Sequence, residues 1–182
     1  MTDDHILEFA PPYYCDLPKI DELVLNRPYV FVDGDMCCVV PATGWLFDGA
    51  SIPRVFWRLI GHPLRGEYRR GALAHDGGYK GILLAYRIVR ATDMVLIAAD
   101  LEGYPNEIPA TLQKRKSLAL ERVDVDNLLY DLARWNGTSK LKAATMRRAV
   151  RMFGGCIWRQ QHAKWAAMQQ ETPAPNVPKE TP

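Results

Sequence analysis

A hairpin pattern near the N-terminus constrains the fold more than any other feature of the sequence. Residues 29–32 (Tyr-Val-Phe-Val) and 36–40 (Met-Cys-Cys-Val-Val) are rich in β-forming side chains, and Asp33-Gly34 stands between them. An Asp-Gly pair suits the positive φ angles that a tight hairpin turn requires. The pattern therefore predicts two antiparallel strands around which the N-terminal part of the chain is built.

The surrounding sequence extends this β structure over residues 6–50. Residues 23–25 and 45–47 are apolar or aromatic and are expected to be partner strands of the hairpin. Cys37 and Cys38 are adjacent, so on a strand their side chains would point to opposite faces. The chain has four cysteines, none with zinc-finger spacing, and this favours a reduced protein.

The second part of the chain, residues 66–168, is predicted to be helical. Apolar periodicity and capping residues indicate helical stretches from about residue 67, over 86–101, up to Asn136-Gly137, and from Thr138 or Ser139 to about 165. Glycines at 77, 78 and 81 indicate the close approach of another backbone or the end of a helix. The third stretch has Asp124 or Asp126 as its N-cap. Its buried stripe is expected to be Leu128, Leu129, Leu132 and Trp135.

With 182 residues, the chain is long enough to bury a substantial core. We expect a single α+β domain over residues 1–168, in which an N-terminal antiparallel β part packs on an antiparallel helical core. Residues 169–182 are rich in proline and are predicted to form a flexible, extended tail. Residues 1–6 are acidic and polar, unlike a signal peptide, and the apolar runs are far shorter than a transmembrane segment.

The net charge of +2 gives the chain as a whole no signature of a nucleic-acid-binding protein. The last predicted helix is a local exception, because residues 140–164 contain no acidic side chain. Its cations are Lys140, Lys142, Arg147, Arg148, Arg151, Arg159 and Lys164. They form either a solvated face or a contact with an anionic partner, nucleic acid or lipid headgroup.

The reactive side chains gather at residues 74–80, where His75 adjoins Asp76 and Tyr79 follows one turn later. Neighbours on a helix project about 100° apart, so Asp76 cannot orient His75 itself. His75 is better placed to handle a proton while Asp76 holds a cation, and a further carboxylate would fix the histidine tautomer. Asp93, three residues after Arg90 on the next predicted helix, is expected to supply that carboxylate.

The loop at residues 47–54, Phe-Asp-Gly-Ala-Ser-Ile-Pro-Arg, offers two further candidates. Asp48 either adds an oxygen ligand to the cation site or accepts backbone N–H bonds and locks the loop. Oxygen ligands favour calcium, or magnesium, over zinc. Ser51 either is a nucleophile with His75 and Asp93 or is an ordinary turn serine.

The sequence His75-Asp-Gly-Gly-Tyr79, followed by Arg90-x-x-Asp93, resembles the catalytic helix pair of phospholipase A-two enzymes, the bacterial forms especially. The disulfide framework of that helix pair is missing here. The resemblance covers about residues 44–100 and implies the following roles. His75 is the water-activating base, Asp93 the carboxylate that orients it, Asp76 and Asp48 the calcium ligands, and Tyr79 and Arg90 the supporting residues.

The chain also resembles short phage and prophage proteins grouped as a domain of unknown function. The motifs that carry this resemblance are residues 44–54 (Gly-Trp-Leu-Phe-Asp-Gly-Ala-Ser-Ile-Pro-Arg), Ala72-x-x-His-Asp-x-x-Tyr79 and Arg90-x-x-Asp93. They appear in order over about residues 20–105. The resemblance implies a phage or prophage origin and a hydrolase site without an established activity.

Two functions remain open at this point. In the first, the protein is a metal-assisted hydrolase of an ester or amide, phospholipase-like, with a lipid or cell-envelope substrate. In the second, it is a non-enzymatic virion, tail or assembly component that contacts other virion proteins, and the His-Asp-Asp cluster braces the fold. Either function is consistent with a location in the host cytoplasm or in the virion.

Overall fold

The computed structural model describes residues 5–12, 14–16, 23–42, 46–47, 67–88 and 90–171. The loop with Asp48 and Ser51 and the tail from residue 172 lie outside these residues. The described part has an N-terminal antiparallel sheet followed by helices, so the predicted α+β class is confirmed.

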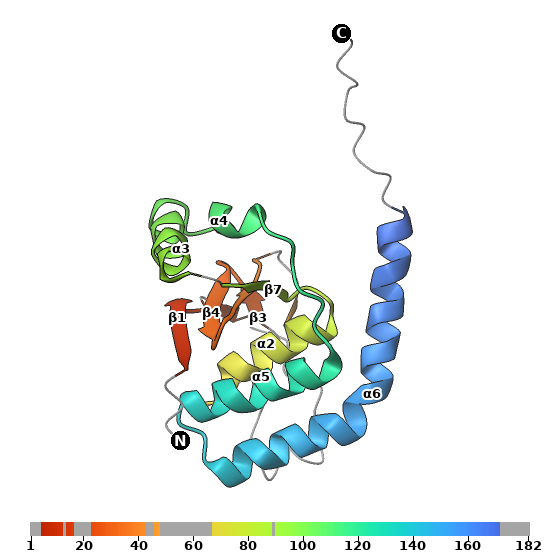
Figure 1. Ribbon diagram of the computed structural model, residues 1–182. Helices are drawn as coiled ribbons and strands as arrows, with labels where there is room; N and C mark the ends of the chain where they lie inside the picture. Colours follow the sequence, from red (N-terminus) through yellow and green to blue (C-terminus); the bar gives the residue numbers. More distant parts are fainter. Residues whose placement is uncertain are drawn as a thin grey trace.

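A four-stranded antiparallel sheet forms the centre of the molecule, with strand order β1-β4-β5-β7 (Figure 1). Its strands are β1 (Ile6–Ala10), β4 (Tyr29–Asp33), β5 (Met36–Val40) and β7 (Leu84–Arg87). The predicted hairpin is therefore confirmed as β4-β5. Asp33 pairs with Met36, so the two-residue turn is Gly34-Asp35, and Gly34 has the positive φ of +60°.

The predicted partner strands of the hairpin are strands, but they lie elsewhere. Strand β3 (Leu23–Leu25) pairs with β2 (Tyr14–Asp16) on one side and β6 (Leu46–Phe47) on the other, which makes a second, three-stranded sheet. The hairpin cannot pair with β3 and β6, because β1 and β7 already occupy its two edges.

Strand β7 corrects the prediction of a helix over residues 86–101. Ala85 pairs with Cys38 and Tyr86 with Cys37, and the helix α3 (Ala91–Gly103) begins only after this strand. A short apolar run reads equally well as a helical turn or a buried strand, and here its pairing with β5 decides. The predicted end of the helix at Gly103 is confirmed.

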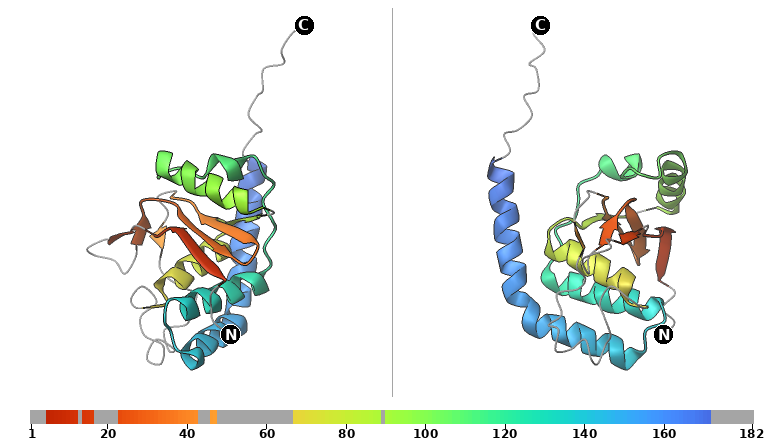
Figure 2. Two further views of the ribbon diagram at one scale, coloured as in Figure 1. Left: turned by 60° about the vertical axis from the view of Figure 1, so that its left-hand side comes forward. Right: turned by 180° about the vertical axis from the view of Figure 1, so that it is seen from behind.

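Helices cover both faces of the four-stranded sheet (Figures 1 and 2). Tyr29 and Phe31 face a core that includes α2 (Arg69–Tyr79), α5 (Arg122–Trp135) and α6 (Lys140–Glu171). Val30 and Val32 face the other core, with α3 and α4 (Ala110–Gln113). Cys37 and Cys38 lie in different cores, as predicted for adjacent residues of a strand.

Two glycines let α2 and α5 pack closely. A Cβ atom on Gly71 would lie 2.8 Å from the Leu129 carbonyl oxygen, and one on Gly78 would overlap the Val125 side chain. Gly81, with φ of +71°, follows Lys80, the C-cap residue of α2. The helix end predicted from the glycine cluster is therefore confirmed, whereas the close neighbour of Gly78 is a side chain of α5 and not its backbone.

Helix α5 begins earlier than predicted, whereas α6 begins after Ser139, one of its two predicted caps. Asp124 is at the third position of α5 and accepts the Glu121 backbone N–H at 2.9 Å, so Glu121 is the N-cap and Asp126 lies in the buried second turn. Ser139 Oγ accepts the Lys142 N–H at 3.4 Å and caps α6. Helix α6 extends to Glu171 and bends midway (Figure 1). None of the described helices is both long and apolar enough to cross a membrane.

Candidate functional site

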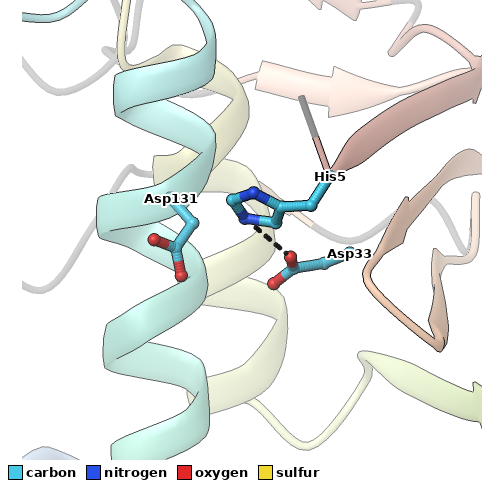
Figure 3. A group of neighbouring side chains, drawn as sticks. All are labelled: His5, Asp33 and Asp131. Carbon is cyan, nitrogen blue, oxygen red and sulfur yellow. Dashed lines mark ion pairs between the residues drawn. The ribbon is translucent and has the colours of Figure 1, made fainter. Parts of the chain in front are cut away.

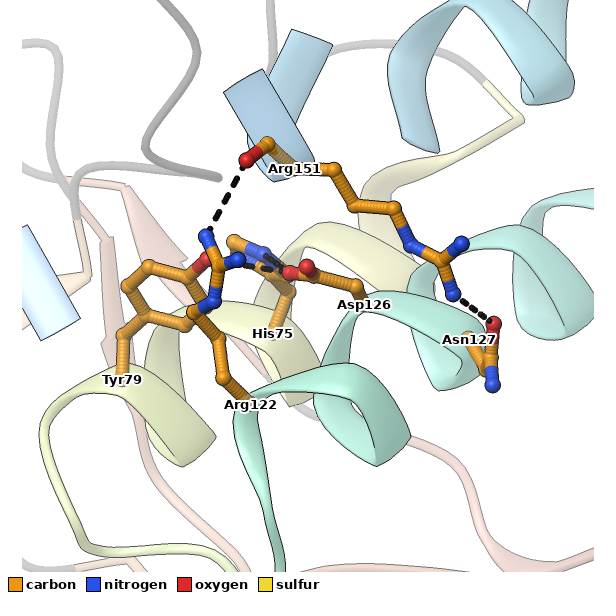
Figure 4. Close-up of polar contacts among 6 residues, drawn as sticks. All are labelled: His75, Tyr79, Arg122, Asp126, Asn127 and Arg151. Carbon is orange, nitrogen blue, oxygen red and sulfur yellow. Dashed lines mark hydrogen bonds and ion pairs between the residues drawn. The ribbon is translucent and has the colours of Figure 1, made fainter. Parts of the chain in front are cut away.

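A buried network of three side chains joins α2 to α5 (Figure 4). Asp126 Oδ1 lies 3.1 Å from His75 Nε2 and accepts a hydrogen bond from the Tyr79 hydroxyl at 2.9 Å. His75 and Tyr79 are one turn apart on α2, and their ring centroids are 4.2 Å apart. We call His75, Asp126 and Tyr79 the buried network. It forms because Gly71 and Gly78 of α2 let the two helices lie close together.

The contacts within this network assign the histidine tautomer. A carboxylate accepts hydrogen bonds, so the proton of the ring belongs on Nε2, which faces Asp126. Nδ1 is buried and has no hydrogen-bond partner, and the same holds for Asp126 Oδ2, as far as the described residues go. His75 therefore presents an unused lone pair on one side of the ring and an anchored N–H on the other.

The surroundings favour the neutral form of the imidazole. Burial lowers the pKa of His75, the carboxylate of Asp126 opposes this, and the Arg122 guanidinium lowers it further. Burial, followed by the charge of Asp126, raises the pKa of Tyr79 above its usual range, so its hydroxyl keeps the proton that it donates. The His75 imidazole is thus held in its neutral form with a fixed orientation.

Helix α6 packs against the outer side of the network. The Tyr79 and Trp158 rings form a T-shaped pair with centroids 5.1 Å apart, and Trp158 stacks on His162 with centroids 3.9 Å apart. A Cβ atom on Gly154 would overlap the Tyr79 hydroxyl, so only glycine fits there without displacement. Arg122 Nη1 donates to the Arg151 carbonyl at 3.1 Å, which links the start of α5 to the same part of α6 (Figure 4).

Asp93, the predicted partner of His75, lies in another layer, and this part of the sequence interpretation is corrected. Its Oδ2 accepts the Arg90 backbone N–H at 3.2 Å, and its Oδ1 pairs with Arg115 at 2.7 Å. Strand β7 carries the chain to the opposite face of the sheet before α3 begins, so α3 cannot pack beside α2. Asp126 takes the position expected for Asp93.

The predicted calcium ligands are only partly described. Asp76 is 3% exposed, and its Oδ2 lies 2.8 Å from Lys80 Nζ, so an ammonium group already balances its charge. Asp48, like the candidate nucleophile Ser51, lies outside the described residues. Within the described part of the chain, these residues therefore do not assemble a calcium site.

Sequence reasoning missed Asp126 as a site residue, although a signal for it exists. Asp126 stands between Val125 and Leu128 on the face of α5 that becomes buried. A carboxylate on the apolar face of an amphipathic helix is seldom fully buried unless it has a partner. Its position there indicates a specific polar contact, but not which residue makes it.

The comparisons with known proteins give two matches of very different extent. A curated relative, the uncharacterized protein y4jT of Sinorhizobium fredii (strain NBRC 101917 / NGR234), is 50% identical over 34 residues. This match covers 19% of the chain but only 10% of the relative. No solved structure matches the chain. A family model described as "Protein of unknown function (DUF1353)" matches residues 23–150, which include α2 and all of α5. Because this match covers more than half of the sequence, the chain belongs to that family.

Proposed function

We propose that this protein is a hydrolase in which His75 acts as the general base. The observation that carries the proposal is the state of the His75 ring: Nε2 is anchored on Asp126, and Nδ1 is buried without a partner among the described residues. A general base needs a lone pair directed at the proton it removes and a second group that fixes its tautomer. The lowered pKa of His75 keeps that lone pair available at neutral pH.

The proposed reaction is the hydrolysis of an ester or amide. His75 Nδ1 removes a proton from water as the water oxygen bonds to the carbonyl carbon. The imidazolium that forms is stabilised by Asp126, whose position is fixed by the Tyr79 hydroxyl. His75 then returns the proton to the leaving oxygen or nitrogen as the carbonyl–heteroatom bond breaks. Because His75 is 0% exposed, substrate access requires an opening beside Nδ1.

A divalent cation at Asp76 is a further part of the proposal, with calcium as the ion expected from the oxygen ligand. Such an ion would replace the Lys80 ammonium at Oδ2 of Asp76. Calcium titration followed by thermal unfolding tests this. We expect calcium to raise the melting temperature more in Lys80→Met than in the wild type, and not at all in Lys80→Met/Asp76→Asn. An equal response of all three proteins would exclude a calcium site at Asp76.

The proposed substrate class is a lipid or another ester of the cell envelope, in a phage or prophage setting. The support is the resemblance of His75-Asp-Gly-Gly-Tyr79 to the phospholipase A-two helix, together with the tyrosine–carboxylate–histidine arrangement of the buried network. In this proposal the protein works in the host cytoplasm or as part of a virion. The basic face of α6 would be the contact with anionic headgroups.

The complete burial of His75 and Asp126 favours one alternative function. The buried network would then brace the crossing of α2 and α5 in a non-enzymatic virion or tail component. Paired buried polar groups are common in proteins for structural reasons alone. Under this alternative, substitutions in the network would change the free energy of unfolding, and no turnover would exist to be lost.

Hydrolysis assays on the purified protein distinguish the two functions. p-Nitrophenyl esters and phospholipid vesicles are tested as substrates with the wild type, His75→Gln, and His162→Gln as a matched histidine control. We expect turnover in the wild type and the control, and loss of turnover in His75→Gln with an unchanged circular dichroism spectrum. Full activity of His75→Gln, or no turnover by the wild type on any substrate, would favour the structural role.

A further inference from the structure

A second histidine–carboxylate group lies at the edge of the molecule, away from the buried network. His5 precedes β1, Asp33 ends β4, and Asp131 lies on α5, so three segments far apart in the sequence meet there (Figure 3). One ligand atom from each residue lies within 4.8 Å of the other two. We call these three residues the edge cluster.

The spacing within the edge cluster fits coordination of a metal ion. His5 Nε2 is 3.1 Å from Asp33 Oδ1. Two ligands that each lie about 2.0–2.1 Å from a zinc ion are roughly 3.3 Å apart in tetrahedral geometry, and about 2.9 Å apart in octahedral geometry. In Figure 3, Asp131 lies on α5 beside the pair formed by His5 and Asp33. The third ligand atom, up to 4.8 Å from the others, therefore has to move closer by up to about 1.5 Å for tetrahedral geometry.

The charges of the edge cluster also fit a cation. Two carboxylates stand beside one imidazole, so the three side chains offer a cation more negative than positive charge. The side chain of Asp33 is 17% exposed and that of His5 is 45% exposed. The group is thus partly shielded from solvent and still open enough for an ion and its water ligands to enter.

We propose that His5, Asp33 and Asp131 form a binding site for a divalent transition-metal ion, with zinc as the ion that fits the donor set. One imidazole nitrogen and two carboxylate oxygens suit zinc and its neighbours, and three protein ligands leave room for water. The ion would fasten the start of β1 and the end of β4 to α5, which joins the sheet to the helical layer. Because the ion requires all three segments in place, its binding would stabilise the folded protein.

Calorimetric titration of the metal-free protein with zinc chloride tests the site, with thermal unfolding as a second readout. The variants are His5→Ala and Asp131→Asn, and the matched controls are His162→Gln and Asp35→Asn. We expect one zinc ion per chain and a raised melting temperature in the wild type and both controls. Each edge-cluster variant should lose affinity by roughly 10- to 100-fold or more.

Cobalt substitution identifies the ligands independently. Bound cobalt should give visible absorption bands typical of nitrogen and oxygen ligands, without a thiolate charge-transfer band. A thiolate band would place the ion on a cysteine and overturn the proposal. So would unchanged zinc affinity in both edge-cluster variants, or the absence of zinc binding by the wild type at 1 mM in about a tenfold excess over protein.

Discussion

The buried network and the edge cluster pair the same residue types at the same distance but in different environments. In each, a histidine Nε2 lies 3.1 Å from an aspartate Oδ1. The His75 and Asp126 side chains are 0% exposed, whereas His5 is 45% exposed. Burial removes water from around His75, and Asp126 fixes the position of its Nε2. The imidazole is therefore held in its neutral form. Exposure leaves His5 able to exchange its partner for an ion. Burial, more than residue identity, thus decides the chemistry available to each pair.

Helix α5 supplies an aspartate to both groups. Asp126 and Asp131 are five residues apart, which places them about 140° apart around the helix axis. One therefore faces α2 and α6, and the other faces the beginning of β1 (Figures 3 and 4). Substitution of one aspartate at a time therefore tests each group separately, with the rest of α5 unchanged.

The largest expected effect is on catalysis. Asp126→Asn should lower kcat on any ester that the wild type hydrolyses by about 10³- to 10⁴-fold, because the amide can no longer fix the tautomer of His75. Asp131→Asn should leave kcat within about twofold of the wild type, since the edge cluster does not touch His75. Steady-state kinetics of both variants checks this. Equal losses in the two variants would mean that the difference between the groups is not functional.

A smaller effect is expected on stability where α6 meets the buried network. Gly154→Ala would push the Tyr79 hydroxyl away from Asp126 and should lower the free energy of unfolding by about 1–3 kcal/mol. The control is Gly103→Ala at the end of α3, where an added methyl group meets no atom within 4 Å. Urea denaturation of both variants measures the difference. A Gly154→Ala protein as stable as the control would show that Tyr79 can move freely.

The smallest expected effect concerns pH. The pKa of His75 is lowered on folding from its ordinary value of 6.5, so the unfolded chain takes up a proton at a pH where the folded protein does not. His75 therefore stabilises the folded protein fully above pH 6.5, and this contribution is lost as the pH falls below that value. Urea denaturation at pH 7.5 and pH 5.5 should show a smaller loss of stability in His75→Gln than in the wild type. A larger loss in the variant would reverse the inferred sign.

For the same reason, the proposed activity should persist into acid. His75 must be deprotonated to act as a base. Because its pKa is lowered, the imidazole stays deprotonated at pH values somewhat below 6.5. The acid limb of the kcat/KM profile is therefore expected below pH 6.5. An acid limb above that value would assign the titration to another group.

Local patterns in the sequence predicted much of this fold. The Asp33-Gly34 region indicated the hairpin, and Asn136-Gly137 marked the end of α5. The residues around His75 indicated where a site would lie. These signals work because a turn, a cap or a helical face is determined by residues close together in the chain.

The partner of His75 could not be predicted in the same way. Asp93 had the right residue type on the next expected helix, but strand β7 places that helix on the far side of the sheet. Asp126 reaches His75 across 51 positions of the sequence, through a helix packing that depends on Gly71 and Gly78. The assembly of the edge cluster from residues 5, 33 and 131 likewise depends on the tertiary fold.

The most direct test of the buried network is the tautomer of His75, measured by long-range ¹H–¹⁵N NMR correlation at neutral pH. We expect a neutral ring with its proton on Nε2, a slowly exchanging Nε2–H signal, and an unprotonated Nδ1. This pattern should be lost in Asp126→Asn and retained in Asp93→Asn. A proton on Nδ1, or a charged ring at neutral pH, would contradict the assignment of His75 as a base held by Asp126.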